Sequence, residues 1–270
     1  MAMQKIFVSI REYFFDMIFP IRCLGCGKNR ENLPARERWI CPDCLSKINL
    51  HREQVCPFCE KESEGGKTHY ACRGKIFLDG LWVATYYDKF IEKAVHDFKF
   101  NFIKDLAHPL SGLMVESILE AEEFGDCQDI MLVNFSKDEE NGIYLDETRN
   151  KKIETVLVPV PLHRRRYNWR GFNQSALLSK NLAEKLGLFV DESVFSRIKN
   201  TKPQSKTGGE EARRKNIDGA FSCVKPEAVK NRNIVLVDDL CTTSATLNEC
   251  AKELKKSGAK NVWGLVVARR

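Results

Sequence analysis

Apolar residues in the second half of the chain fall into two alternating patterns. Mostly apolar runs at residues 155–162, 234–240 and 262–268 have the length of buried strands, whereas residues 172–186 and 244–256 have helical spacing. Strands that alternate with helices in this way are typical of a parallel sheet covered on both faces. The pattern therefore predicts an α/β fold for this part of the chain.

The α/β domain begins upstream of these elements and is interrupted once. Residues 81–87 read as a strand, and residues 90–120 have helical spacing. The acidic, irregular stretch at residues 122–152 favours a surface insertion. We therefore divide the chain into an N-terminal region, residues 1–75, and the α/β domain, residues 76–270.

An amphipathic helix is predicted within residues 1–20. This segment is apolar, but Arg11, Glu12 and Asp16 interrupt it well short of a length that spans a membrane. Packing of the helix against the body of the protein is the favoured interpretation, and docking on a membrane or a partner is the alternative. Because the sequence contains neither a signal peptide nor a membrane span, we expect a cytoplasmic protein with no stable membrane insertion.

Composition and charge exclude some classes of protein and leave others open. The 270 residues are 43% hydrophobic and 30% charged, which is typical of a folded globular protein and excludes a disordered or fibrous one. Lys and Arg number 43 against 37 Asp and Glu, which gives a net charge of +6. This surplus does not establish nucleic-acid binding, but it is compatible with phosphate-bearing partners.

Seven of the 11 cysteines lie in the first quarter of the chain. In the reducing cytosol, such cysteines are better explained by metal binding than by disulfides. The first four have the spacing C-x2-C…C-x2-C, which allows two tight turns to present four thiolates to Zn²⁺ in a tetrahedron. These residues are Cys23, Cys26, Cys41 and Cys44.

A second set repeats this logic with one imidazole in place of a thiolate. It consists of Cys56, Cys59, His69 and Cys72. Closed four-ligand sites of this kind leave no position for water, so we expect their role to be structural. Simple burial of small cysteine side chains is the alternative, and the pairing could interleave the two sets.

Two adjacent carboxylates, Asp238 and Asp239, stand at the end of an apolar run. Small and hydroxyl residues follow at the expected start of a helix: Thr242, Thr243, Ser244, Ala245 and Thr246. Ligands of parallel sheets bind beyond the carboxyl ends of the strands, and a helix start offers free N–H groups to a phosphate. The carboxylates could accept hydrogen bonds from vicinal sugar hydroxyls or help hold Mg²⁺. The alternative is a strand whose acidic end simply caps a helix.

A basic segment with interleaved aromatic residues follows the strand at residues 155–162. Arg165 and Arg166 could bind pyrophosphate through bidentate contacts, but a solvated basic loop is equally compatible with the sequence. The neighbouring Tyr167 and Trp169 suit stacking on unpaired bases. Burial of these rings in the core is the alternative.

The segment at residues 234–246 closely resembles the 5-phosphoribosyl-1-pyrophosphate (PRPP) signature of type I phosphoribosyltransferases. Together with the cysteine-rich region and six further motifs, it makes the chain resemble the ComF/GntX family, which are competence-associated phosphoribosyltransferase-like proteins with an N-terminal double zinc ribbon. The resemblance covers nearly the whole chain except the insertion near residues 122–152. The motifs are HDFKF (96–100), VPVPLHRRR (158–166), RGFNQS (170–175), TKPQ (201–204), RRKN (213–216) and GAF (219–221).

The resemblance implies a PRPP-type pocket in a parallel-sheet, phosphoribosyltransferase-like domain. In this pocket Asp238 and Asp239 would meet the ribose, and residues 242–246 would form the loop around the 5′-phosphate. One position departs from the family pattern, which usually has Gly where this chain has Ser244. Serine keeps the backbone N–H but is strained if φ must be positive, which puts the affinity for phosphate in question.

Two functions follow from the resemblance. The first is an enzyme, a phosphoribosyltransferase, in which an unidentified acceptor displaces pyrophosphate from PRPP with the help of Mg²⁺. The second is a binding protein that keeps the phosphoribosyl pocket without catalysis and handles incoming single-stranded DNA during natural transformation. In that case the zinc-binding region would dock a partner from the competence machinery, such as a helicase or a membrane channel.

Overall fold

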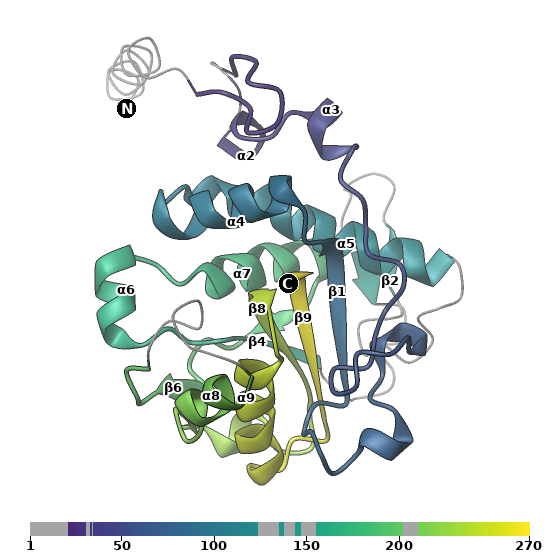
Figure 1. Cartoon of the computed structure of the whole chain (residues 1–270), viewed down its shortest axis with the longest axis vertical. Helices are drawn as coiled ribbons and strands as arrows, with labels where there is room; N and C mark the ends of the chain where they lie inside the picture. The colour runs from purple at the N-terminus through teal and green to yellow at the C-terminus, as the bar shows by residue number, and fades with distance from the viewer. Residues whose placement is uncertain are drawn as a thin grey trace.

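Figure 1 shows the computed structural model of the chain, which describes residues 21–30, 33, 35–123, 135–137, 144–146, 155–201 and 210–270. The predicted N-terminal helix and most of the predicted acidic insertion lie outside these residues. In the part of the chain that is described, no helix combines the length and the apolar character needed to cross a bilayer.

Five parallel strands form the central sheet in the order β1-β9-β8-β4-β5 (Figure 1). The inner strands are rich in valine, leucine and isoleucine, as is typical of strands buried on both faces. Val235 of β8 lies beside Leu157 of β4 and Trp263 of β9. The predicted α/β fold with a parallel sheet is confirmed. The strands are β1 (Gly80–Tyr86), β4 (Thr155–Pro159), β5 (Phe189–Val190), β8 (Asn233–Cys241) and β9 (Asn261–Arg269).

Helices cover both faces of this sheet, and each face has its own apolar core (Figure 1). Successive residues of a strand point to opposite faces, so Val235 of β8 joins one core while Ile234 and Leu236 join the other. The first core is covered by α4 (Lys89–Phe100), α5 (Ala107–Glu123) and α7 (Gln174–Leu186). The second core is covered by α8 (Glu210–Ile217) and α9 (Ala245–Lys256).

Local signals in the sequence fix the ends of α4 and α7. The carboxylate of Asp88 accepts a hydrogen bond from the Ile91 N–H at the start of α4, over 2.8 Å. Asn173 caps α7 in the same way, by accepting from the Ser175 N–H over 3.2 Å. Gly187 ends α7 in the left-handed conformation, with φ of 63°. These caps set which residues α4 and α7 present at the carboxyl edge of the sheet.

The cysteine-rich region, residues 21–76, lies along α4 and along the open edge of β1 (Figure 1). In its first half, the Leu24 carbonyl accepts a hydrogen bond from Lys93 of α4 over 3.2 Å. In its second half, the side chain of Gln54 donates to and accepts from the backbone of Val83 in β1, over 3.0 and 2.9 Å. An uncovered sheet edge exposes unpaired N–H and C=O groups. The cysteine-rich region therefore provides hydrogen-bond partners for part of the free backbone groups of β1.

Several short elements connect these layers. The basic segment after β4, for which the sequence is equally compatible with a loop, forms α6 (Arg164–Arg170), which ends at Gly171 with φ of 76°. The other short helices are α2 (Ala35–Arg38), α3 (Pro42–Leu45), η1 (Glu64–Gly66), η2 (Tyr70–Cys72), η3 (Lys104–Leu106) and η5 (Pro226–Ala228). The antiparallel pairs are β2 (Phe135–Lys137) with β3 (Tyr144–Asp146), and β6 (Phe195–Arg197) with β7 (Phe221–Cys223).

Candidate functional site

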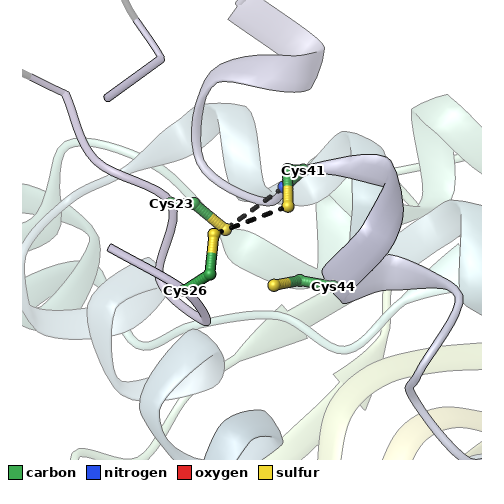
Figure 2. Close-up of side chains that lie close together, drawn as sticks. All are labelled: Cys23, Cys26, Cys41 and Cys44. Atoms are coloured by element: carbon green, nitrogen blue, oxygen red, sulfur yellow. Dashed lines mark hydrogen bonds between the residues drawn. The ribbon is translucent and has the colours of Figure 1, made fainter. Parts of the chain in front are cut away.

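The four cysteines of the first predicted set come together in one place, the first cluster. Figure 2 shows the sulfur atoms of Cys23, Cys26, Cys41 and Cys44 turned toward one another, and all of them lie within 4.8 Å of each other. Cys26 Sγ and Cys41 Sγ are 3.8 Å apart. Thiolates bound to one zinc ion at about 2.3 Å in a tetrahedron are separated by about 3.8 Å. This donor set therefore fits Zn²⁺.

Two tight turns build the first cluster. The Gly27 N–H donates to the Cys23 carbonyl, and the Cys44 N–H donates to the Cys41 carbonyl, each over 3.0 Å. The first turn needs glycine at Gly25, because a Cβ there would lie 2.7 Å from Cys44 Sγ. Burial raises the pKa of Cys23, but hydrogen bonds from backbone N–H groups outweigh burial and lower the pKa to about 6. This environment favours the thiolate form that binds metal.

The second cluster consists of Cys56, Cys59, His69 and Cys72, whose ligand atoms also lie within 4.8 Å of each other. His69 Nδ1 is 3.2 Å from Cys59 Sγ, and His69 Nε2 is 3.0 Å from the Glu62 carbonyl oxygen. A proton on Nε2 that is donated to this carbonyl leaves Nδ1 free to bind a metal. The two predicted sets are therefore separate rather than interleaved, and the second also fits a structural Zn²⁺.

A cavity of about 830 Å³ lies at the carboxyl edge of the sheet. Its walls come from residues just beyond β1 and β4, from the end of β8, from α4, α6 and the start of α7, and from the segment between β8 and α9. Ligands of open parallel sheets bind at this edge. Cationic side chains outnumber acidic ones in its lining, which favours an anionic ligand. These residues are Lys99, Arg166, Arg170, Arg197 and Arg270 against Glu92, Asp238 and Asp239.

The two predicted acids lie inside this cavity. Ser175 Oγ donates to Asp238 Oδ1 over 2.8 Å, and Lys99 Nζ lies 2.8 Å from Asp239 Oδ1. The side chain of Asp239 is only 3% exposed, and its second oxygen, Oδ2, is buried with no hydrogen-bond partner among the described residues. A buried carboxylate oxygen without a donor is costly. Asp239 therefore carries a carboxylate oxygen that a hydrogen-bond donor or a cation would stabilise, although this oxygen itself is not open to the cavity.

The protonation of the two acids is linked. Burial and the negative charge of Asp239 raise the pKa of Asp238 to about 7. The charge of Lys99 and the hydroxyl of Ser175 act in the opposite direction. Near neutral pH Asp238 is therefore close to its titration midpoint, and Lys99 Nζ lies beside the pair, 2.8 Å from Asp239 Oδ1.

The predicted phosphate loop, residues 242–246, is divided between two cavities. Thr242 and Thr246 line the cavity that holds the acids. Thr243 and Ala245 line a neighbouring cavity of about 370 Å³ instead. Beside this neighbouring cavity, Thr243 Oγ1 is buried with no hydrogen-bond partner in the described part of the chain. The structure thus brings Thr242 and Thr246 to the acids, but not Thr243 or Ala245.

Ser244 has a backbone conformation for which glycine is the usual residue. It is the N-cap of α9 and has φ of 55° and ψ of 2°. This left-handed conformation costs a residue with a Cβ on the order of 1 kcal/mol. The Ser244 hydroxyl makes no capping hydrogen bond to the start of α9 and lies 3.3 Å from Cys241 Sγ. The turn before α9 therefore keeps its left-handed form with serine in place.

Three arginines, of which Arg170 is buried and the other two are half-buried, supply most of the positive charge in the cavity. Arg166 donates to a backbone carbonyl over 2.8 Å, and Arg170 donates to Gln174 Oε1. Burial lowers the pKa of Arg170, and the charge of Asp239 opposes this shift. Burial and the charge of Arg166 lower the pKa of Arg197 to about 10. These arginines remain protonated at neutral pH, so an anion entering the cavity meets fixed positive charge.

Arg165, predicted to bind pyrophosphate together with Arg166, is exposed and is not among the described residues that line the cavity. In α6, Arg166 and Arg170 are four residues apart and share one face, whereas Arg165 does not. The i, i+4 spacing is the signal that could have found Arg170. Sequence reasoning leaves the role of Lys99 open and assigns no role to several other lining residues. These are Arg170, Gln174, Ser175, Arg197 and Arg270.

Comparison with known protein families identifies the cysteine-rich region. The model of the double zinc ribbon domain matches residues 14–73. This range contains all eight residues of the two clusters. The match and the geometry agree that the N-terminal region has the form of a zinc-binding double ribbon.

Curated proteins match over most of the chain. Competence protein F of Haemophilus influenzae is 27% identical over 257 residues, which cover 93% of this chain and 98% of that protein. The DNA utilization protein YhgH of Salmonella typhi is 28% identical over 84% of this chain and 89% of its own. The competence protein ComFC of Bacillus subtilis is 25% identical over 81% of this chain and 79% of its own. These matches confirm the resemblance that the motifs indicate.

Among solved structures, the allosteric regulatory enzyme of purine biosynthesis is similar to part of this protein. The similar part covers 44% of this chain and 23% of the enzyme's chain. The two are 18% identical, with a TM-score of 0.28. This likeness is too partial to bear on the fold.

Proposed function

Because the chain is a homologue of the ComF competence proteins and has an N-terminal double zinc ribbon, we propose that it binds PRPP in the cavity at the sheet edge. It would transfer the phosphoribosyl group to an acceptor that is still to be identified, with Mg²⁺ present. Because its relatives are named for competence and for DNA utilization, we also propose that it works in the cytoplasm in the handling of DNA taken up by the cell.

One observation carries this proposal: Asp239, whose Oδ2 has no hydrogen-bond partner among the described residues, lines a cavity in which cations outnumber acids. A ribose offers two vicinal hydroxyls, and two adjacent carboxylates can accept hydrogen bonds from both. Asp238 and Asp239 would hold the ribose in this way. Thr242 and Thr246 at the start of α9 would then receive the 5′-phosphate, because a helix start binds phosphate through its N–H groups and its dipole.

The opposite end of the ligand would meet α6 and the segment near β6. Arg166, Arg170 and Arg197 line the cavity with guanidinium groups that are largely shielded from water. Fixed cations of this kind stabilise the negative charge that develops on departing pyrophosphate. The arginines would therefore bind the pyrophosphate and ease its departure.

The acids also fit a hard cation. Asp238 and Asp239 offer carboxylate oxygens, the ligand type that Mg²⁺ prefers, and Asp239 Oδ2 accepts no hydrogen bond from the described residues. When bound, Mg²⁺ would neutralise part of the pyrophosphate charge. Lys99 already balances one carboxylate charge at 2.8 Å, so the acids would hold the cation together with ligand oxygens rather than alone.

Isothermal titration of the protein with PRPP in the presence of MgCl₂ tests this proposal. We expect the wild type to bind PRPP and the Asp239→Asn variant to bind it at least about tenfold more weakly, since a hydrogen bond to a charged group contributes about 1.5–3 kcal/mol. Asp218→Asn is the matched control, because this exposed carboxylate lies outside the lining of the acid cavity. No heat and no thermal shift with PRPP would refute the proposal.

A second candidate function is binding of single-stranded DNA without transfer chemistry. It is favoured by α6, where Tyr167 and Trp169 are 50% and 58% exposed beside Arg164 and Arg165. Exposed rings interleaved with cations suit stacking on unpaired bases. In this case affinity for an oligonucleotide falls steeply with ionic strength and survives Asp239→Asn. Absence of oligonucleotide binding at low salt would remove this candidate.

A further inference from the structure

Both clusters begin with the same kind of turn, in which the residue after the second cysteine has positive φ. In the first cluster Gly27 donates its N–H to the Cys23 carbonyl over 3.0 Å, with φ of 72°. In the second cluster Glu60 donates to the Cys56 carbonyl, also over 3.0 Å, with φ of 59°. This left-handed backbone is free of strain for glycine but not for a residue with a Cβ. Glu60 therefore stands where glycine would form the same turn without strain.

The side chain of Glu60 points away from the zinc site and reaches the end of the central sheet. Its Oε1 forms an ion pair with Nη2 of Arg269, the last residue of β9, which lies 209 positions further along the chain. The Glu60 side chain is 65% exposed, so the pair contributes little to stability. Stability alone does not account for a strained glutamate in this turn. Strain kept without a gain in stability is typical of a functional position.

Arg269 depends on Glu60 for its charge partner. Its side chain is only 11% exposed, and its Nη1 is buried with no hydrogen-bond partner among the described residues. A buried guanidinium is costly unless it is paired. In the described part of the chain, Glu60 supplies the ion pair of Arg269. Without Glu60, Arg269 would have reason to turn toward water and to loosen the end of β9.

The end of β9 is attached to the start of the predicted phosphate loop. Arg269 is in register with Cys241, the last residue of β8 and the one before this loop. The Arg270 N–H donates to the Cys241 carbonyl over 2.9 Å, and Arg270 lines the cavity that holds the acids. Burial raises the pKa of the Cys241 thiol, and the positive charge of Arg269 opposes this shift. The guanidinium therefore lies close enough to act on the segment that leads into residues 242–246.

We propose that Glu60 is a positioning residue, which through Arg269 holds the ends of β8 and β9 so that the phosphate loop can receive the 5′-phosphate. The second cluster then has a task beyond its own region, because it fixes the turn that carries Glu60. This inference rests on the proposed function, since it concerns the same phosphate site. A direct electrostatic effect of Glu60 would have the opposite sign, because removal of a negative charge would strengthen the binding of an anion.

Two variants break the ion pair and leave all eight metal ligands in place: Glu60→Gly and Glu60→Gln. Isothermal titration should show that both bind ribose 5-phosphate at least about fivefold more weakly than the wild type, the lower end of the range for coupling between separate sites. The affinity for inorganic pyrophosphate should stay within about twofold, because the arginines proposed to bind it lie on α6 and β6 and distant sites act independently.

The matched control is Glu62→Gln. It removes an exposed carboxylate two residues away that, in the described part of the chain, does not pair with Arg269. It should bind ribose 5-phosphate as the wild type does. Glu60→Asp keeps the charge on a shorter side chain and should restore part of the affinity that Glu60→Gln loses.

Stability and hydrogen exchange separate positioning from a general effect on the fold. Glu60→Gly relieves the strain at φ of 59°, so it should keep two zinc ions and unfold at a temperature no lower than the wild type, although it binds ribose 5-phosphate more weakly. In the absence of ligand, the amides of residues 241–248 should exchange faster in Glu60→Gly, while those of residues 23–44 should not change. Native mass spectrometry gives the zinc content.

The outcomes distinguish this inference from the proposed function. If neither ribose 5-phosphate nor PRPP binds the wild type, the proposed function fails, and faster exchange of residues 241–248 in Glu60→Gly still supports the positioning of this segment. The inference is refuted if both Glu60 variants bind ribose 5-phosphate as tightly as the wild type or more tightly, or if the exchange of residues 241–248 does not change. Loss of zinc or a lower unfolding temperature in Glu60→Gly would also overturn it, because the fold itself would then be affected.

Discussion

The cysteine clusters and the cavity at the sheet edge are assembled from the chain in opposite ways. Each cluster takes all its ligands from a short stretch, residues 23–44 or residues 56–72, and satisfies them within that stretch. The cavity takes its residues from segments between Tyr87 and Arg270, and it leaves a carboxylate oxygen of Asp239 without a partner among the described residues. The clusters therefore contribute to stability, whereas the cavity gives up some stability to present binding groups.

The two clusters also differ from each other in what they support. The first cluster packs on α4, where a Cβ on Gly25 would touch the ring of Phe90. The second cluster lies on the side of the predicted phosphate loop, where Pro57 and Phe58 line the same cavity as Thr243. Each cluster therefore packs beside one element that lines the cavity holding the acids. This element is α4 for the first cluster and α9 for the second.

The largest expected effect is on the clusters. Cys56→Ser should remove one zinc ion of two and destabilise the protein by more than about 4 kcal/mol, because a region this short has little core of its own. Native mass spectrometry measures the zinc content, and thermal unfolding measures the stability. Cys223→Ser, at a cysteine outside both clusters, should keep two zinc ions. A folded protein without any metal would contradict the structural role.

The next effect concerns the ion pair in the cavity. Lys99→Met leaves the charge of Asp239, whose side chain is 3% exposed, without its partner at 2.8 Å, and should lower the free energy of unfolding by about 3 kcal/mol. The double variant Lys99→Met with Asp239→Asn should recover most of this loss, yet it should not bind PRPP. Chemical denaturation gives the free energies. A double variant as unstable as the single one would show that the charge of Asp239 is not the cause.

Stability should also depend on pH through Asp238. Its pKa is raised to about 7 in the folded protein from an ordinary value of 3.8, so between these values the folded state binds more protons than the unfolded state. This contribution to stability is present below pH 4 and is lost as the pH rises toward 7. Relative to Asp238→Asn, the wild type should lose about 3 kcal/mol across this range, measured by urea unfolding. A constant difference between the two proteins would contradict the raised pKa.

The smallest effect is expected at Ser244. Ser244→Gly removes the strain of a Cβ at φ of 55° and should stabilise the protein by about 0.5–1 kcal/mol. Ser244→Ala keeps the Cβ and should give no such gain. Differential scanning calorimetry resolves a change of this size. Equal stability of the glycine and alanine variants would mean that the left-handed turn carries no strain.

Sequence patterns identify the parts of the molecule that depend on local spacing. The C-x2-C pairs predict which cysteines share a cluster, and the apolar run before Asp238 and Asp239 predicts a strand that delivers both acids to the sheet edge. The left-handed turn at Ser244 is also signalled in the sequence, because the family pattern has glycine there. In each case the responsible residues lie within a few positions of one another or repeat a fixed period.

The remaining part of the site depends on contacts between distant segments. Lys99 meets Asp239 across 140 positions of sequence, and no periodic pattern encodes this contact. The choice of Arg166 and Arg170 over Arg165 requires knowing that the basic segment is a helix, since only then does one face select residues four apart. The positive φ of Phe102, which places an exposed ring against Trp169, has no glycine or asparagine to announce it.

Binding of PRPP between the two acids and the arginines can be seen directly in a structure of the protein crystallised with PRPP and MgCl₂. We predict the ribose hydroxyls within hydrogen-bond distance of Asp238 and Asp239, the 5′-phosphate at Thr242 and Thr246, and the pyrophosphate at the guanidinium groups of the cavity. A crystal in which PRPP binds elsewhere, with Asp239 still paired with Lys99 in a cavity without ligand, would contradict the proposed function.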